Sequence, residues 1–202
     1  MDVTDLLPVI QQRRSVRRYA TEPVQNELLE TLLQAAVWAP SAHNRQPWRF
    51  AVLQSDAQKE CLADAMGDRF RADRLAAGDP PEAVAQDMER SRQVLTQAPA
   101  LLLCCMSMAD MDRYPDARRA QAERTMAIQS VALAAQNLLL VAHAAGLGAC
   151  WRCAPLFCPD TVRETLQLPA DWEPQAIISI GYAAEAGRPP ERRPLTEVVQ
   201  WI

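Results

Sequence analysis

A polar loop at residues 39–50 lies between an apolar helical pattern and an apolar strand pattern. Pro40 restricts the backbone where the loop begins. Ser41, Asn44 and Gln46 follow it, and their hydroxyl and carboxamide groups both donate and accept hydrogen bonds. This combination suits a planar heterocycle that presents carbonyl and ring-nitrogen edges. A solvated turn is the alternative interpretation for such a loop taken alone.

A basic cluster near the start of the chain offers a second type of chemistry, because residues 13–18 contain four arginines. In an extended segment, Arg13, Ser15 and Arg17 lie on one side, where two guanidinium groups beside a hydroxyl can clamp a phosphate. Three further arginines near the other end of the chain can close the same clamp: Arg188, Arg192 and Arg193. A solvated basic face is the alternative. Neither cluster contains the glycine-rich phosphate loop of P-loop or Rossmann proteins.

A Cys-x-x-Cys pair at Cys150 and Cys153 follows a glycine pair in the sequence. Such cysteines occur as a redox dithiol or as half of a zinc site. The sequence has no second Cys-x-x-Cys pair and no thioredoxin-like pattern around this one, so two unlinked thiols are the alternative. We expect no metal site.

Length and charge limit the class of protein. A chain of 202 residues with 49% hydrophobic residues predicts one globular domain, residues 1–202. The net charge of −4 argues against nucleic-acid or anionic-membrane partners. No run approaches the roughly 18 apolar residues of a membrane span. Asp2 and Asp5 contradict the basic start of a signal peptide, so we expect a cytoplasmic protein with reduced thiols.

Helical patterns outnumber strand patterns. We predict helices at residues 6–10, 28–37, 117–145 and 159–166, and helical residues 56–97 interrupted at 78–81 by a hinge that can make this segment a mobile lid. We predict strands at residues 49–54, 100–108, 147–151 and 176–182.

Two predictions concern the long helix at 117–145 and the C-terminal segment. The helix at 117–145 is so apolar near residues 131–141 that we expect it to be buried almost all round, with Gly146 as its left-handed stop. Residues 195–202 either clasp a partner subunit or pack on their own domain. The irregular spacing of the strands favours an α+β sandwich over a doubly wound parallel sheet.

The order of four motifs resembles that of the FMN-dependent nitroreductase family. The motifs are Arg-Arg-Ser-Val-Arg at residues 13–17, Ala-Pro-Ser-Ala-His-Asn-Arg-Gln-Pro-Trp at 39–48, Gly-Leu-Gly-Ala-Cys-Trp at 146–151, and Gly-Tyr at 181–182 before a basic, proline-rich tail. The resemblance spans nearly the whole chain, and the order and spacing make the combination specific. Within the family, residues 114–117 and 168–174 are most similar to the flavin-binding domain attached to the glutamate ligase of deazaflavin coenzyme (factor 420) biosynthesis.

The resemblance implies a three-layer α+β sandwich with a central, mostly antiparallel sheet flanked by helices, in an intertwined homodimer that binds FMN. It implies that the FMN phosphate and ribityl chain are held by Arg13, Arg14, Ser15, Arg17, Arg192 and Arg193. It implies that the isoalloxazine ring is approached by a loop of the other subunit, formed by Pro40, Ser41, Ala42, Asn44 and Gln46. Backbone N–H groups of Trp151, Arg152 and Cys153 are implied near flavin N5 and O4, where they tune hydride transfer.

The activity implied by the resemblance is that of an FMN-dependent oxidoreductase. NADH or NADPH reduces the flavin, and a small planar acceptor such as a nitroaromatic or a quinone is then reduced; residues 56–97 set its specificity. The flavin carries the chemistry, so no catalytic residue is assigned. His43 is the candidate proton donor, although solvent can protonate the product. Two alternatives stay open: a reductase or binding domain for a deazaflavin coenzyme precursor, and a non-enzymatic flavin-binding dimer.

Overall fold

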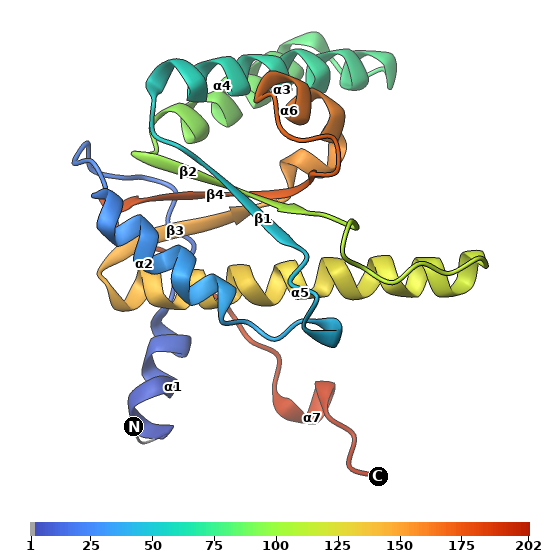
Figure 1. The fold of residues 1–202 in the computed structure, drawn as a ribbon. Helices are drawn as coiled ribbons and strands as arrows, with labels where there is room; N and C mark the ends of the chain where they lie inside the picture. The colour runs from blue at the N-terminus through green and yellow to red at the C-terminus, as the bar shows by residue number, and fades with distance from the viewer. Residues whose placement is uncertain (1–2) are drawn as a thin grey trace.

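The computed structural model describes residues 3–202, and Asp2 lies outside the described residues. Its centre is one antiparallel sheet of four strands in the order β1-β2-β4-β3 (Figure 1). The strands are β1 (Trp48–Leu53), β2 (Ala100–Met106), β3 (Leu147–Arg152) and β4 (Glu173–Tyr182). All four strands that the sequence predicts are therefore present, with β4 starting three residues earlier.

Helices cover both faces of the sheet, as Figure 1 shows. The helices α2 (Asn26–Val37) and α5 (Ala117–Ala144) lie on one face, and α3 (Asp56–Ala76), α4 (Pro81–Thr96) and α6 (Pro159–Thr165) lie on the other. Strand β2 is buried along its whole length, with Leu102 facing one apolar cluster and Leu101 and Leu103 facing the second. A strand covered on both faces needs a continuous apolar sequence. The predicted α+β three-layer sandwich is confirmed.

Four shorter elements complete the described chain: α1 (Val3–Gln12), α7 (Leu195–Val198), and the 3-10 helices η1 (Ala42–Asn44) and η2 (Ala154–Phe157). Figure 1 shows α1 and α7 projecting from the same side of the molecule. Residues 195–202 are exposed, and Trp201 is 92% exposed. The alternative in which this segment packs on its own domain is therefore wrong, whereas the clasp on a partner stays a prediction.

Helix α5 begins and ends as the sequence predicts. The Asp116 carboxylate caps its N-terminus by accepting a hydrogen bond from the Arg119 N–H at 2.9 Å. Gly146 follows its C-terminus with a φ of 78°, a left-handed conformation that glycine adopts without steric cost. The expected burial all round is wrong, because Ile128 and Leu133 are 38% and 46% exposed. These two apolar side chains lie on the part of α5 that faces solvent.

By length and composition, α5 is also apolar enough to cross a membrane, which the sequence analysis did not anticipate. In this structure, 44% of its most apolar window is buried inside the chain. Its packing against the sheet gives a direct reason for the apolar composition, because a central helix needs apolar residues to fill the core.

Candidate functional site

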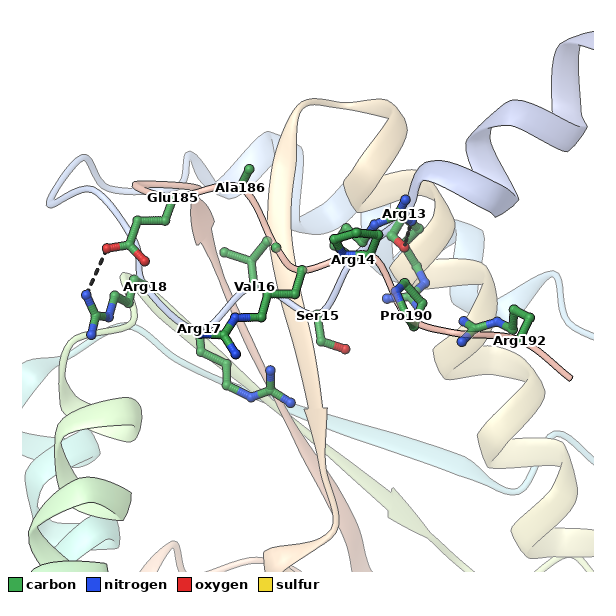
Figure 2. A pocket seen from close by; sticks show the side chains of 13 residues that line it. Arg13, Arg14, Ser15, Val16, Arg17, Arg18, Glu185, Ala186, Pro190 and Arg192 are labelled. Carbon is green, nitrogen blue, oxygen red and sulfur yellow. Dashed lines mark hydrogen bonds and ion pairs between the residues drawn. The ribbon is translucent and has the colours of Figure 1, made fainter.

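A cavity of about 820 Å³ separates the two basic clusters of the sequence, and we call it the arginine cavity. Its lining consists of residues 13–18 and 185–190 together with Arg192. Segments from opposite ends of the chain thus meet at one site (Figure 2). The structure brings Arg188 and Arg192 to the N-terminal cluster, as the sequence predicts, whereas Arg193 does not line the cavity.

Backbone contacts hold the N-terminal wall of the arginine cavity against β3. The Val16 N–H donates to the Ala149 carbonyl at 3.1 Å, and Ser15 forms a parallel bridge with Ala149. Val16 packs directly over Gly148, where an added Cβ would lie 2.7 Å from the Val16 Cβ. Glycine is therefore required at position 148 for this close approach. The opposite wall is held in the same way, because a Cβ on Gly187 would lie 2.4 Å from the Arg14 Cβ.

A partly buried tyrosine also anchors this wall. The Tyr19 hydroxyl donates to the Val16 carbonyl at 2.6 Å and lies 2.7 Å from Ser179 Oγ. Burial raises the pKa of Tyr19 well above its usual value. The hydroxyl is therefore neutral at physiological pH and serves as a structural link between the arginine cavity and β4.

The predicted alternation of side chains is correct for part of the segment. Figure 2 shows Ser15 and Arg17 on one side and Val16 on the other, and Val16 is buried. Arg13 does not belong to this alternation, because its N–H donates to the Val9 carbonyl at 3.2 Å and continues the hydrogen bonding of α1. Arg13 still lines the cavity because α1 ends beside it.

The arginine cavity carries an excess of positive charge. Arg18 pairs with Glu185 at 2.8 Å, and Glu185 is the one acidic residue among those that line the cavity. Within residues 3–202, five lining arginines form no ion pair: Arg13, Arg14, Arg17, Arg188 and Arg192. Unpaired guanidinium groups around one space favour an anionic ligand with several acceptor oxygens.

A second cavity of about 590 Å³ lies between the α3–α4 pair and the end of β3, and we call it the apolar cavity. Its wall includes the apolar side chains of Met66, Phe70, Met88, Trp151 and Phe157. Arg17 lines both cavities, so a single elongated ligand can contact both. Sequence reasoning missed the contribution of Met66 and Phe70, which are four residues apart on α3 and therefore share one helix face.

Arginines in the wall of the apolar cavity differ in how they are paired. Arg69 pairs with Asp73 at 2.9 Å, and Arg74 pairs with Asp79 and Asp87. Arg152 forms no ion pair with any described residue, like Arg17. The free positive charge of this cavity therefore lies at its β3 side.

Cys153 lines the apolar cavity at the end of β3, and the Trp151 Nε1–H donates to its Sγ at 2.8 Å. Cys150 lies within the extended strand, three residues earlier. At about 3.3 Å per residue, the two Cα atoms lie roughly 10 Å apart, whereas a disulfide needs less than about 7 Å. A redox dithiol formed by this pair is therefore incompatible with the observed backbone. In the described part of the chain, no three metal-ligating side chains are grouped to hold a metal.

The polar loop is rigidly built around η1. His43, Asn44 and Gln46 have φ values of 49°, 54° and 49°, the left-handed region that is uncommon for residues with a side chain. The Ser41 hydroxyl accepts a hydrogen bond from the Gln46 N–H at 3.1 Å, which closes the loop. The Ala42 N–H donates to Ser130 Oγ of α5 at 3.4 Å. None of residues 40–46 lines either cavity of the same chain.

The sequence profile of the Nitroreductase family matches residues 10–182 of this chain. The chain belongs to the nitroreductase family. The profile covers the N-terminal wall of the arginine cavity, the polar loop and the end of β3. The polar loop combines exposure with three left-handed residues, a strained conformation that is more frequent at functional sites than elsewhere.

Three known proteins show how similar the relatives are. The chain is 33% identical over 216 residues to an NADH dehydrogenase of Thermus thermophilus, covering 100% of this chain and 98% of that protein. It is 31% identical over 191 residues to 5,6-dimethylbenzimidazole synthase of Rhodospirillum rubrum, covering 91% and 84%. A Desulfovibrio desulfuricans protein described as a nitroreductase, with a structure in complex with FMN, is 29% identical with a TM-score of 0.75, covering 98% of this chain and 96% of that one.

Apart from Arg193, which lines neither cavity, the predicted site residues divide into three groups. Arg13, Arg14, Ser15, Arg17 and Arg192 line the arginine cavity. Trp151, Arg152 and Cys153 line the apolar cavity. Pro40, Ser41, Ala42, Asn44 and Gln46 belong to the polar loop, as does His43, and within one chain the loop contacts neither cavity.

Proposed function

We propose that this nitroreductase is an FMN-dependent oxidoreductase that takes hydride from NADH or NADPH and reduces a small planar acceptor. The observation that carries the proposal is the meeting of the two cavities at Arg17. FMN has a phosphate at one end and a flat aromatic ring at the other. A positively charged cavity joined to an apolar one matches both ends of such a molecule.

The residues of the arginine cavity fit the phosphate end. Arg13 and Arg17 are free of ion pairs, so they can donate charge-assisted hydrogen bonds to phosphate oxygens. The exposed Ser15 hydroxyl lies between them on the chain and supplies a neutral donor. Arg192 extends toward this group from the C-terminal segment (Figure 2).

The residues of the apolar cavity fit the ring end. Met66 and Phe70 offer apolar surface, and residues 151–153 line the cavity where β3 ends. When bound, FMN supplies a hydride carrier at its N5 atom. Backbone N–H donors near the ring favour the electron-rich reduced flavin. We assign this role to residues 151–153. His43 stays the candidate proton donor, although solvent can protonate the product without a side-chain acid.

We further propose that the site is completed by the polar loop of a second subunit. The loop is preorganised, yet it lines neither cavity of its own chain. Ile128 and Leu133 of α5 are exposed, and the Ala42 N–H of η1 donates to Ser130 of the same helix. Large apolar side chains exposed on a core helix favour a subunit interface. A homodimer formed there places Ser41 and Asn44 toward the partner.

The α3–α4 pair is the proposed determinant of acceptor specificity. Met66, Phe70 and Met88 come from this pair and form the outer wall of the apolar cavity. Flexible methionines beside an aromatic ring adapt to flat acceptors of different outline, such as quinones and nitroaromatics. Gly78 separates α3 from α4 with a φ of 87°, which fixes the sharp turn between them.

The test is spectroscopic. The purified protein, reconstituted with FMN, should show flavin absorbance that bleaches on anaerobic addition of NADH or NADPH and returns when a quinone or nitroaromatic is added. A protein that does not take up FMN would contradict the proposal. Bound FMN that neither nicotinamide reduces would favour the non-enzymatic dimer. Reoxidation by a deazaflavin alone would favour the deazaflavin alternative.

A further inference from the structure

More arginines line the arginine cavity than one flavin phosphate can use. A phosphate monoester carries a charge of about −1.5 to −2 at neutral pH. Five unpaired arginines face this space, and Arg13, Arg17 and Arg192 are already enough to surround one phosphate. Arg14 and Arg188 remain. The Arg14 guanidinium donates to the Gln11 and Arg13 carbonyls, which orient it and leave its positive charge without an ion pair. Guanidinium groups that face one another without anions repel, so the cavity is suited to a second anionic group.

The positions of the two remaining arginines are fixed by the backbone. Gly187 packs against Arg14, and the Ala184 N–H donates to the Arg18 carbonyl at 3.0 Å. These contacts hold residues 184–188 alongside residues 14–18. Arg14 and Arg188 therefore line the same cavity as Arg13 and Arg17, and do not belong to a separate surface.

The geometry of hydride transfer indicates which anion reaches this place. The reacting atoms of reductant and flavin must approach to about 3–3.5 Å, so the nicotinamide has to stack on the ring in the apolar cavity. Because Arg17 lines both cavities, a nicotinamide dinucleotide whose ring stacks there can reach the arginine cavity with its pyrophosphate. Its pyrophosphate carries two negative charges and many acceptor oxygens.

We propose that Arg14 and Arg188 form a second phosphate subsite that binds the pyrophosphate of the nicotinamide dinucleotide beside the flavin phosphate. The proposal rests on the proposed function, because it requires flavin in the apolar cavity. It assigns Arg188 as a specificity residue for phosphate-bearing reductants. The volume of about 820 Å³ accommodates both phosphate groups.

The chain offers a matched control in Arg18. Arg18 lines the same cavity as Arg188, but Glu185 already neutralises it at 2.8 Å. The variants Arg188→Gln and Arg18→Gln remove one guanidinium group each from the same cavity. A general loss of positive potential affects both, whereas a specific subsite responds to Arg188→Gln alone.

The experiment compares NADH with 1-benzyl-1,4-dihydronicotinamide, a reductant with the same ring and no phosphate. For the FMN-loaded protein, we expect Arg188→Gln to lower the ratio of kcat/KM for NADH to that for the benzyl compound by about fivefold, as for loss of one partly exposed ionic contact. Arg18→Gln should change the ratio by less than twofold. Equal falls in both variants, or an unchanged ratio in Arg188→Gln, would overturn the subsite.

A binding measurement gives the same answer without turnover. ADP-ribose carries the pyrophosphate and cannot reduce the flavin, so its Kd from calorimetry should rise about fivefold in Arg188→Gln and stay within twofold in Arg18→Gln. An unchanged Kd in Arg188→Gln would contradict the proposal. If neither reductant bleaches the flavin, the proposed function fails, and the ADP-ribose titration still decides the subsite.

Discussion

Gly148→Ala is the perturbation that most specifically tests how the two cavities are joined. The added Cβ would lie 2.7 Å from the Cβ and Cγ1 of Val16 and 3.0 Å from its Cγ2. Ordinary carbon contacts are about 3.5–4.0 Å, so Val16 must move by roughly 1 Å. Val16 is branched at Cβ and buried, so rotation of its side chain cannot relieve the contact.

This shift has two measurable consequences. Overpacking of a buried contact costs about 1–3 kcal/mol of folding stability. A displacement of about 1 Å would also lengthen the phosphate contacts from Ser15 and Arg17, and loss of about 1.4 kcal/mol weakens binding tenfold. We therefore expect a lower Tm and an FMN Kd about tenfold higher for Gly148→Ala, from quenching of flavin fluorescence as apo-protein is titrated.

Gly67→Ala is the control for this experiment. Its added Cβ would lie 3.4 Å from the Met88 Cε, the mobile end of a flexible side chain. Gly67 lies inside α3, where alanine is favoured by about 0.5–1 kcal/mol. Stability should therefore stay equal or rise. A Gly148→Ala protein with native Tm and native FMN affinity would refute the reasoning that β3 positions the arginine cavity.

Three other predictions concern single groups. Arg13→Ala should weaken FMN binding by about 1.5–3 kcal/mol, because the substitution removes one charge-assisted phosphate contact. The variant should still elute as a folded dimer in gel filtration. A fall in apo-protein stability would instead place Arg13 in a structural network. The raised pKa of Tyr19 means that folding favours its neutral form. The contribution of Tyr19 to stability is therefore constant below about pH 10 and falls above it, by up to about 1.4 kcal/mol per pH unit. Tyr19→Phe should reduce this fall in alkaline urea denaturation, and an identical pH profile would contradict it. Protein purified in air and then denatured should show six free thiols in a thiol titration, because Cys150 and Cys153 lie too far apart to form a disulfide. A result of four thiols would indicate a disulfide.

Local patterns predicted most of the fold. The apolar run of β2 and the stop of α5 at Gly146 are determined by neighbouring residues, so the sequence alone was enough to place them. The predicted strand at 100–108 ends at Met106. The Ser107 N–H still donates to Pro47, which lies opposite it in register, but Pro47 has no N–H to return, and the Ser107 hydroxyl donates to Asp171. These partners are distant in sequence, and no local pattern contains them.

The candidate site was predicted only in part for the same reason. The meeting of Arg13 with Arg192 was predicted, but the position of Arg193 outside the cavity depends on how the chain runs after β4. The contribution of Phe70 depends on how α3 crosses the end of β3, which a helical pattern cannot give. The exposed face of α5 was missed because the apolar pattern of a helix is the same whether the helix packs on its own chain or on another subunit.

The most direct test of the central claim is a crystal structure of the protein with FMN. We predict a phosphate bonded to Arg13, Ser15 and Arg17 in the arginine cavity, a ring in the apolar cavity beside residues 151–153, and the polar loop of the partner subunit against that ring. A flavin bound away from Arg17, or a ring contacted by the polar loop of its own chain, would contradict the account.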